Sequence, residues 1–210
     1  MLVSPVFTTF NQMIKFWQSS ILVISALLVV TPLPAQDEQA GGEKFKWEPL
    51  NIRTSLFSQD LVMLNSERNE YAGNLATYAG NKIAEQGASI KSLESGRRIL
   101  GLALQLSPRN KQAVVIQFQL GKGILPEKTD ADYSPQVLAR LLLTRGQLLM
   151  KQPEEENTIL ARYLITLASE IDPHNDDAVY GSELIRIDHG SPDWSTLTDP
   201  KNDQESASPE

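Results

Sequence analysis

The sequence predicts an all-α protein, an irregular array of antiparallel helix pairs that follows an N-terminal signal or anchor helix. Apolar residues recur at helical spacing through most of the chain between residues 59 and 187. Serine, asparagine, proline and glycine interrupt this pattern at the positions where helices begin and end. An uncharged apolar run at residues 21–30 precedes this region and is set apart from it.

The first 35 residues have the parts of a secretory signal. Lys15 precedes the apolar run 21–30, and Ala35 offers a small residue for cleavage after it. The run is short for a helix that spans a bilayer, which needs about 20 residues. We therefore expect cleavage after Ala35 and export to the periplasm or the cell exterior. Extension back through Phe16 and Trp17 leaves a membrane anchor that faces out of the cytoplasm as the alternative.

Met13 offers a second start site for this signal. It would place Lys15 close to the front of a compact signal, and the twelve residues before Met13 carry no charge. This suggests the hypothesis that translation starts at Met13, downstream of the first methionine of the given sequence.

Composition limits the classes of partner and site. The chain has no cysteine, which excludes disulfides, thiolate metal sites and a lipid on cysteine. The net charge is −7, yet residues 36–187 hold twenty acidic against seventeen basic groups. No basic stripe of the kind that binds a phosphate backbone is present, so we expect no nucleic-acid partner.

Four regions follow from these patterns: a signal or anchor at 1–35, a linker at 36–58, a helical domain at 59–190 and a disordered acidic tail at 191–210. Apolar residues of the linker are expected on the first helix, and Trp194 and Leu197 on the last one. Within the domain, the pattern predicts helices at 59–86, 89–106, 110–120, 136–151, 154–171 and 176–187. A loop is expected at 123–134.

The domain contains an internal repeat, because residues 97–114 align with residues 162–179. A small residue, a proline and an asparagine recur in each copy: Ala103, Pro108 and Asn110 in the first, Ala168, Pro173 and Asn175 in the second. Alanine allows two helices to approach closely. Proline ends one helix, and asparagine caps the next.

This junction resembles the one between successive tetratricopeptide repeats. Ala161, Ala168 and Pro173 match the small, small and proline positions of that family's second helix and its exit turn. Gly96, Ala103 and Pro108 match them in the first copy, and Gly146 matches the glycine of a first helix. The resemblance implies stacked helix pairs that bind a protein or peptide on one face, with no cofactor.

The resemblance also has a departure. The two copies lie 65 residues apart, close to two repeats of about 34 residues. Three predicted helices nevertheless separate the junctions, where paired helices would require four. The sequence therefore predicts packing like that of tetratricopeptide repeats and leaves a regular superhelix open.

The densest polar cluster is at residues 172–177. Asp172, Asp176 and Glu183 take the first, fifth and twelfth positions of an EF-hand-like loop. Asp177 stands where that loop needs glycine, and His174 replaces an oxygen ligand. We therefore interpret the segment as a helix cap and predict no metal site.

No catalytic motif stands out. The two histidines, His174 and His189, fall in a turn and at a helix end, and no serine has the setting of a hydrolase nucleophile. The triplet 121–123 lacks the spacing of a phosphate loop and reads as a helix end. We therefore expect a non-enzymatic protein and keep a small hydrolase or metal-binding protein as the weaker alternative.

The predicted function is a protein–protein interaction module of the cell envelope or secretory compartment. Arg140, Thr144, Gln147 and Lys151 lie opposite the apolar stripe of their helix and form the expected partner-binding face. The alternative reading of these residues is an ordinary solvated side. A structural, membrane-tethered protein that acts by self-association is the alternative function.

Overall fold

The computed structural model describes residues 45–52, 55–58 and 61–199. Contacts divide the chain into Met1–Gly41 and Gly42–Glu210, and all described residues belong to the second unit. The predicted signal or anchor, with Met13 and Ala35, and residues 200–210 of the predicted tail lie outside the described residues.

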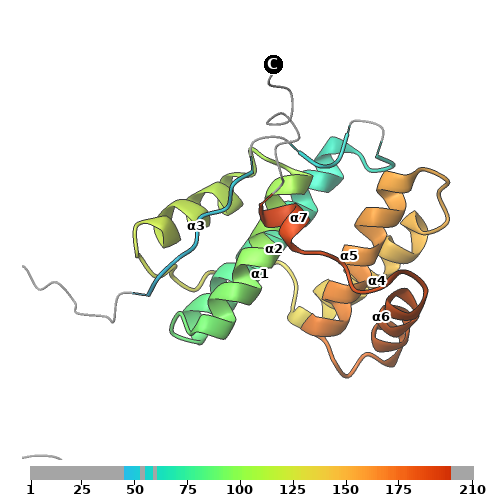
Figure 1. Ribbon diagram of the computed structural model, residues 1–210. Helices are drawn as coiled ribbons and strands as arrows, with labels where there is room; N and C mark the ends of the chain where they lie inside the picture. Colours follow the sequence, from blue (N-terminus) through green and yellow to red (C-terminus); the bar gives the residue numbers. More distant parts are fainter. Residues whose placement is uncertain (1–44, 53–54, 59–60, 200–210) are drawn as a thin grey trace, which may run out of the picture. The chain divides into compact units, whose positions relative to one another are not determined.

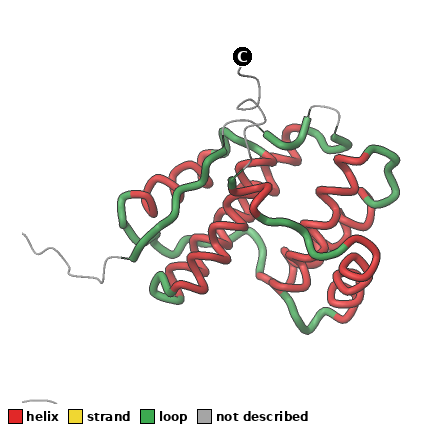
Figure 2. Tube along the Cα trace, viewed as in Figure 1, coloured by secondary structure: helices red, strands yellow, loops and turns green. Residues whose placement is uncertain are grey.

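The described residues form helices and loops without a strand (Figures 1 and 2). This confirms the all-α prediction for that part of the chain. The helices are α1 (Asn65–Glu85), α2 (Ile90–Leu106), α3 (Lys111–Gly121), α4 (Pro135–Leu149), α5 (Glu155–Ile171), α6 (Asp176–His189) and the short α7 (Ser195–Thr198). The loop predicted at 123–134 is confirmed. None of these helices combines the length and apolar character that a membrane span requires.

Side-chain caps place the helix starts where the sequence predicts them. The Asn110 and Asn175 side chains each accept a hydrogen bond, at 3.1 Å, from the backbone N–H three residues further along. Ser134 caps α4 in the same way at 3.3 Å, with Pro135 as the first helical residue. These bonds satisfy N–H groups that have no partner inside a helix.

The first helix begins at Asn65, so the predicted start at residue 59 is wrong. The segment just before α1 turns instead, with its backbone bound to α5. The Val62 N–H donates to Asn157 Oδ1 at 3.0 Å, and Leu61 and Met63 are buried on either side of it. A tertiary contact therefore overrides the local helical pattern.

The six longer helices form two groups of three, and the short α7 lies on α2. In one, α1 pairs with α2, and α3 packs mainly on α1; in the other, α4 pairs with α5, and α6 packs mainly on α5. The 65-residue spacing of the sequence repeat corresponds to this three-helix group. Three helices, α3, α4 and α5, separate the two junctions in the structure, as the sequence predicts.

A glycine lets α4 and α5 approach closely. A Cβ atom on Gly146 would lie 2.5 Å from Ile165 Cγ1 and 3.2 Å from the backbone oxygen of Ala161. The equivalent hairpin of the first group has Gly96 in α2 against the side chain of Ile83 in α1. The repeat residues Ala103 and Ala168 are fully buried.

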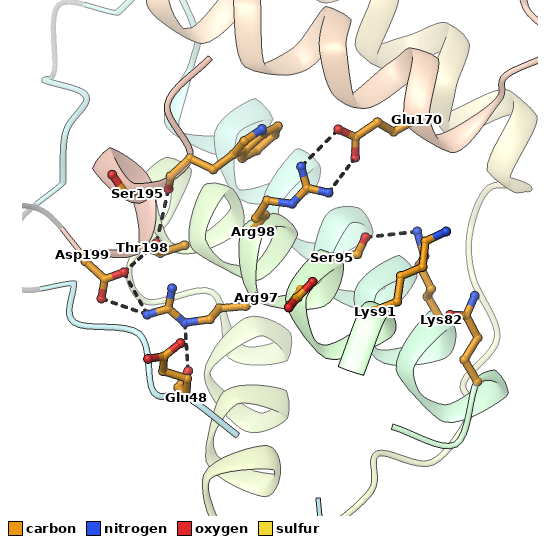
Figure 3. A pocket seen from close by; sticks show the side chains of 13 residues that line it. Glu48, Lys82, Lys91, Ser95, Arg97, Arg98, Glu170, Ser195, Thr198 and Asp199 are labelled. Atoms are coloured by element: carbon orange, nitrogen blue, oxygen red, sulfur yellow. Dashed lines mark hydrogen bonds and ion pairs between the residues drawn. The ribbon is translucent and has the colours of Figure 1, made fainter. Parts of the chain in front are cut away.

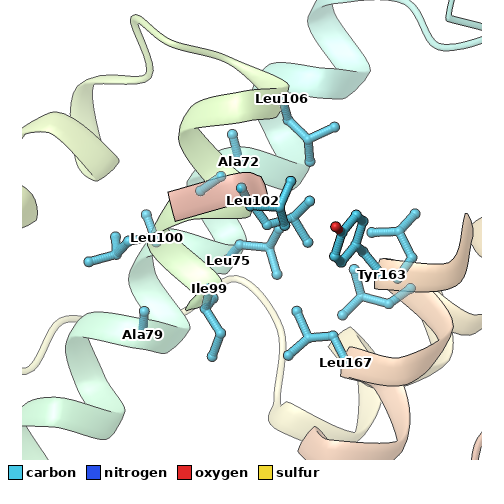
Figure 4. Packing of buried hydrophobic residues seen from close by; sticks show 14 of the residues in the cluster. Ala72, Leu75, Ala79, Ile99, Leu100, Leu102, Leu106, Tyr163 and Leu167 are labelled. Atoms are coloured by element: carbon cyan, nitrogen blue, oxygen red, sulfur yellow. The ribbon is translucent and has the colours of Figure 1, made fainter. Parts of the chain in front are cut away.

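Apolar side chains join the two groups into one core. Figure 4 shows Leu75 and Leu102 of the first group on one side and Tyr163 and Leu167 of the second on the other. All four are buried.

The buried face of α4 is narrower than the apolar stripe that the sequence pattern predicts, which consists of Val137, Leu138, Leu141, Leu142, Leu148 and Leu149. Leu138, Leu142 and Leu149 are buried, but Leu141 and Leu148 are exposed, which corrects the prediction for these two residues. α4 packs against α5 and, more lightly, α6. Those contacts cover only part of its apolar face.

Both terminal segments of the described chain lie against α2. Trp47, Leu50 and Phe57 are buried within the predicted linker, and Leu197 is fully buried in α7. Residues 191–199 are therefore packed, which corrects the predicted tail up to that point. The linker contacts α2 through Arg97 and Gln105, and it also contacts the first helix, because Arg68 of α1 donates to the backbone oxygens of Phe57 and Ser58. The expected placement of Trp194 and Leu197 on the last predicted helix is wrong, because Leu197 lies against α2 and Trp194 against Tyr163 of α5.

Candidate functional site

A polar cleft of about 840 Å³ lies over α2 (Figure 3). Residues from the extended N-terminal segment, α1, α2, α5 and α7 line it. We call it the α2 cleft. One feature of the sequence points to this cleft, the adjacent Arg97 and Arg98 in α2.

Arg97 holds both terminal segments to α2. Its guanidinium donates to the backbone oxygens of Glu48 and Pro49, at 3.0 and 3.2 Å. The same group binds the carboxylate of Asp199 at 2.8 and 3.0 Å. These hydrogen bonds from Arg97 lower the pKa of Asp199.

Arg98 joins α2 to the second helical group. Its two terminal nitrogens bind the two carboxylate oxygens of Glu170 in α5, at 3.2 and 3.1 Å. Its guanidinium also lies 5.0 Å from the ring centre of Trp194, within the range of a cation–π interaction. The Trp194 ring meets Tyr163 edge to face at 5.1 Å. Arg98 therefore links α2 to α5 and to the segment that precedes α7.

Lys82 closes the other end of the α2 cleft. Its ammonium donates to Ser95 Oγ at 3.1 Å and lies 5.7 Å from the ring centre of Tyr78. Burial lowers the pKa of Lys82 because desolvation disfavours its charged form. Arg97, Arg98 and Lys82 thus all have partners within the protein. We therefore interpret the α2 cleft as a structural junction between elements.

A second open groove, of about 800 Å³, lies between α4 and the turn from α5 to α6. Arg140, Thr144 and Gln147 line its α4 side. Asp172, His174, Asp176 and Asp177 line the opposite side. We call it the α4 groove.

The α4 groove contains three of the four residues predicted as the partner-binding face. Arg140, Thr144 and Gln147 are all exposed and line the same side. Lys151 follows the end of α4 and is exposed, but it does not line the groove. The acidic wall of the groove, formed by Asp172, Asp176 and Asp177, was not predicted. The sequence pattern at residues 172–177 predicts only a turn and a helix cap.

Arg97 and Arg98 of the α2 cleft form ion pairs, whereas the charged residues of the α4 groove do not among the described residues. Among the described residues, neither Arg140 nor the three aspartates of the groove form an ion pair. Arg140 thus faces the three aspartates across an open space, and no ion pair within the described part of the chain neutralises these charges. Such a groove can hold a chain that carries both an acidic and a basic or amide group.

The polar turn 172–177 is organised as a cap. The Asn175 side chain binds the start of α6, and Asp172 Oδ1 accepts the His174 N–H at 3.3 Å. Glu183, the twelfth residue of the EF-hand-like spacing, forms an ion pair with Arg186 at 2.6 Å. No cluster of three metal-binding side chains occurs within residues that the structure describes.

Comparison with known proteins gives no relative: no family model, no curated protein and no solved structure matches this chain.

Proposed function

We propose that this protein is a non-enzymatic protein-interaction module of the cell envelope or secretory compartment, and that the α4 groove binds an extended peptide segment of its partner. The observation that carries this proposal is the placement of Arg140 and Gln147 across the groove from Asp172, Asp176 and Asp177. These side chains are polar and accessible, and their charges are unpaired among the described residues.

The polarity of the groove favours a peptide over a small apolar ligand. A pocket for a small apolar molecule is lined mostly by apolar and aromatic side chains. Here Leu143 is the one apolar side chain among those that line the groove. A peptide presents backbone amides and alternating side chains along an extended line, which suits Thr144, Gln147 and the charges beside them.

Packing like that of tetratricopeptide repeats is part of the proposal. The close α4–α5 hairpin at Gly146, the buried Ala168 and the cap at Asn175 support it. The three-helix period distinguishes this chain from a regular array of helix pairs. Location in the envelope or secretory compartment rests on the signal or anchor proposed for residues 1–35.

The test is capture of a partner from an envelope extract with the full-length protein, followed by mapping of the bound segment as a synthetic peptide. We expect Arg140→Ala to weaken binding of that peptide by about three- to tenfold, the effect of losing one exposed charge contact. Asp176→Ala tests the opposite wall in the same way.

Lys151→Ala is the matched control, since it removes an equally exposed cation that does not line the groove. Peptide affinities that are equal for the wild type, Arg140→Ala and Asp176→Ala would contradict the proposal. An equal loss of peptide affinity in Arg140→Ala and Lys151→Ala would show that the peptide binds outside the groove.

A further inference from the structure

Helix α6 exposes an apolar stripe on the side that faces away from the core. Its inner side holds Ala178, Gly181 and Ile185, and a Cβ atom on Gly181 would lie 3.2 Å from Ile165 of α5. The opposite side carries three large apolar residues at helical spacing: Tyr180 (67% exposed), Leu184 (41%) and Ile187 (70%). We call this set the α6 stripe.

Like α6 in the second group, α3 is the third helix of the first group, although it packs mainly on the first helix of its group instead of the second. Its inner residues Ala113, Ile116 and Leu120 stand 65 positions before those of α6, so the repeat extends through both third helices. Its outer side exposes an apolar set as well. This set, the α3 stripe, consists of Val114, Val115 and Phe118 and continues into Ile124 and Leu125 of the following loop.

The charges beside the two stripes have opposite signs. Residues 107–126 contain Arg109, Lys111 and Lys122 and no acidic residue. Residues 176–189 contain four acidic residues, Asp176, Asp177, Glu183 and Asp188, against Arg186. An apolar centre lets two helix faces exclude water when they meet, and opposite charges beside it favour one partner and one orientation. The α3 and α6 stripes together offer both features.

We propose that the α3 stripe of one copy of this protein docks on the α6 stripe of a second copy. Within one copy the two helices lie on opposite sides of the helical unit (Figure 1), so the contact joins different molecules. The occupant of each stripe is thus a second copy of this chain.

The contact joins two different surfaces and is therefore heterologous. A bound pair still offers one free α3 stripe on one copy and one free α6 stripe on the other, so association continues unless a ring closes. Neither stripe shares a residue with the lining of the α4 groove, and Glu183 and Asp188 beside the α6 stripe also lie outside that lining. Asp176 and Asp177 line the groove, so only Glu183 and Asp188 serve to test the α6 stripe. Peptide binding and self-association can therefore succeed or fail independently.

Charge-swap complementation of the full-length protein tests the proposal, with mass measured by sedimentation over a range of concentrations. The first variant is Lys111→Glu/Lys122→Glu, and the second is Glu183→Lys/Asp188→Lys. We expect wild-type mass to rise with concentration beyond a dimer or into a ring. Each variant alone should associate at least about tenfold more weakly, because like charges then meet across the contact.

An equimolar mixture of the two variants should regain wild-type association, because each swapped surface then meets an opposite charge. Recovery in the mixture separates a specific contact from misfolding. A monomer at all concentrations would overturn the proposal, as would association that both swaps leave unchanged. Association lost in only one variant would indicate a symmetric contact of one helix with its own copy and would also overturn it.

Discussion

Gln105 in α2 accepts a hydrogen bond from the backbone N–H of Leu56 through Oε1, at 2.6 Å. Its Nε2 donates to the backbone oxygen of Leu197 at 3.1 Å. The side chain is fully buried. One glutamine of the central helix thus provides hydrogen-bond partners for segments from both ends of the described chain.

We expect Gln105→Leu to lower the free energy of unfolding by about 1–3 kcal/mol, because a buried N–H and a buried carbonyl lose their partners. Urea unfolding monitored by circular dichroism measures this change. Gln147→Leu is the matched control on the exposed side of α4 and should stay within about 0.5 kcal/mol of the wild type. Equal stability of the two variants would show that the bridge contributes nothing.

We expect Gly146→Ala to destabilise the protein by about 1–3 kcal/mol through overpacking at the α4–α5 crossing. Alanine gains about 1 kcal/mol over glycine in helix propensity, so a net loss reports the steric contact. Gly121→Ala in α3 is the control, because a Cβ there meets no atom within 4 Å. A Gly146→Ala variant as stable as Gly121→Ala would mean that Ile165 repacks freely.

The repeat asparagines should differ in their contribution to stability. Asn110 caps α3 and also donates, at 3.0 Å, to the backbone and side-chain oxygens of Asn69. Within the described part of the chain, the Asn175 side chain is bound only as a cap. We expect Asn175→Ala to cost about 1 kcal/mol and Asn110→Ala about 1–2 kcal/mol more, measured by chemical denaturation. Losses of the same size would rule out a role for the bonds to Asn69.

The sequence predicted the local features of the fold well, because periodicity and capping act within a few residues. The helix junctions with Asn110 and Asn175 lie where the pattern places them. Features that depend on distant residues were not predictable. The start of α1 depends on Asn157, which lies 95 positions away from Val62. The positions of the terminal segments depend on their hydrogen bonds with Gln105 and Arg97.

The candidate site divides in the same way. Arg140, Thr144 and Gln147 share one side of a helix, so spacing alone groups them. The acidic wall that faces them comes from a turn some thirty residues further along, and only the packing of α4 near the α5–α6 turn brings it there. Lys151 fits the spacing but follows the last turn of α4, beyond the groove.

Asp199 should titrate below its ordinary pKa of about 3.9, because Arg97 stabilises its charged form. A depressed pKa in the folded state contributes stability above the unfolded value, and this contribution is lost as pH falls through the folded value. We expect Arg97→Gln to raise the pKa of Asp199 toward its ordinary value and to remove this low-pH dependence. Carboxyl ¹³C shifts measured from pH 6 downward follow the titration. Arg109→Gln, in the turn before α3, should leave it unchanged. Identical titration of Asp199 in both variants would show that Arg97 does not hold the segment that ends α7.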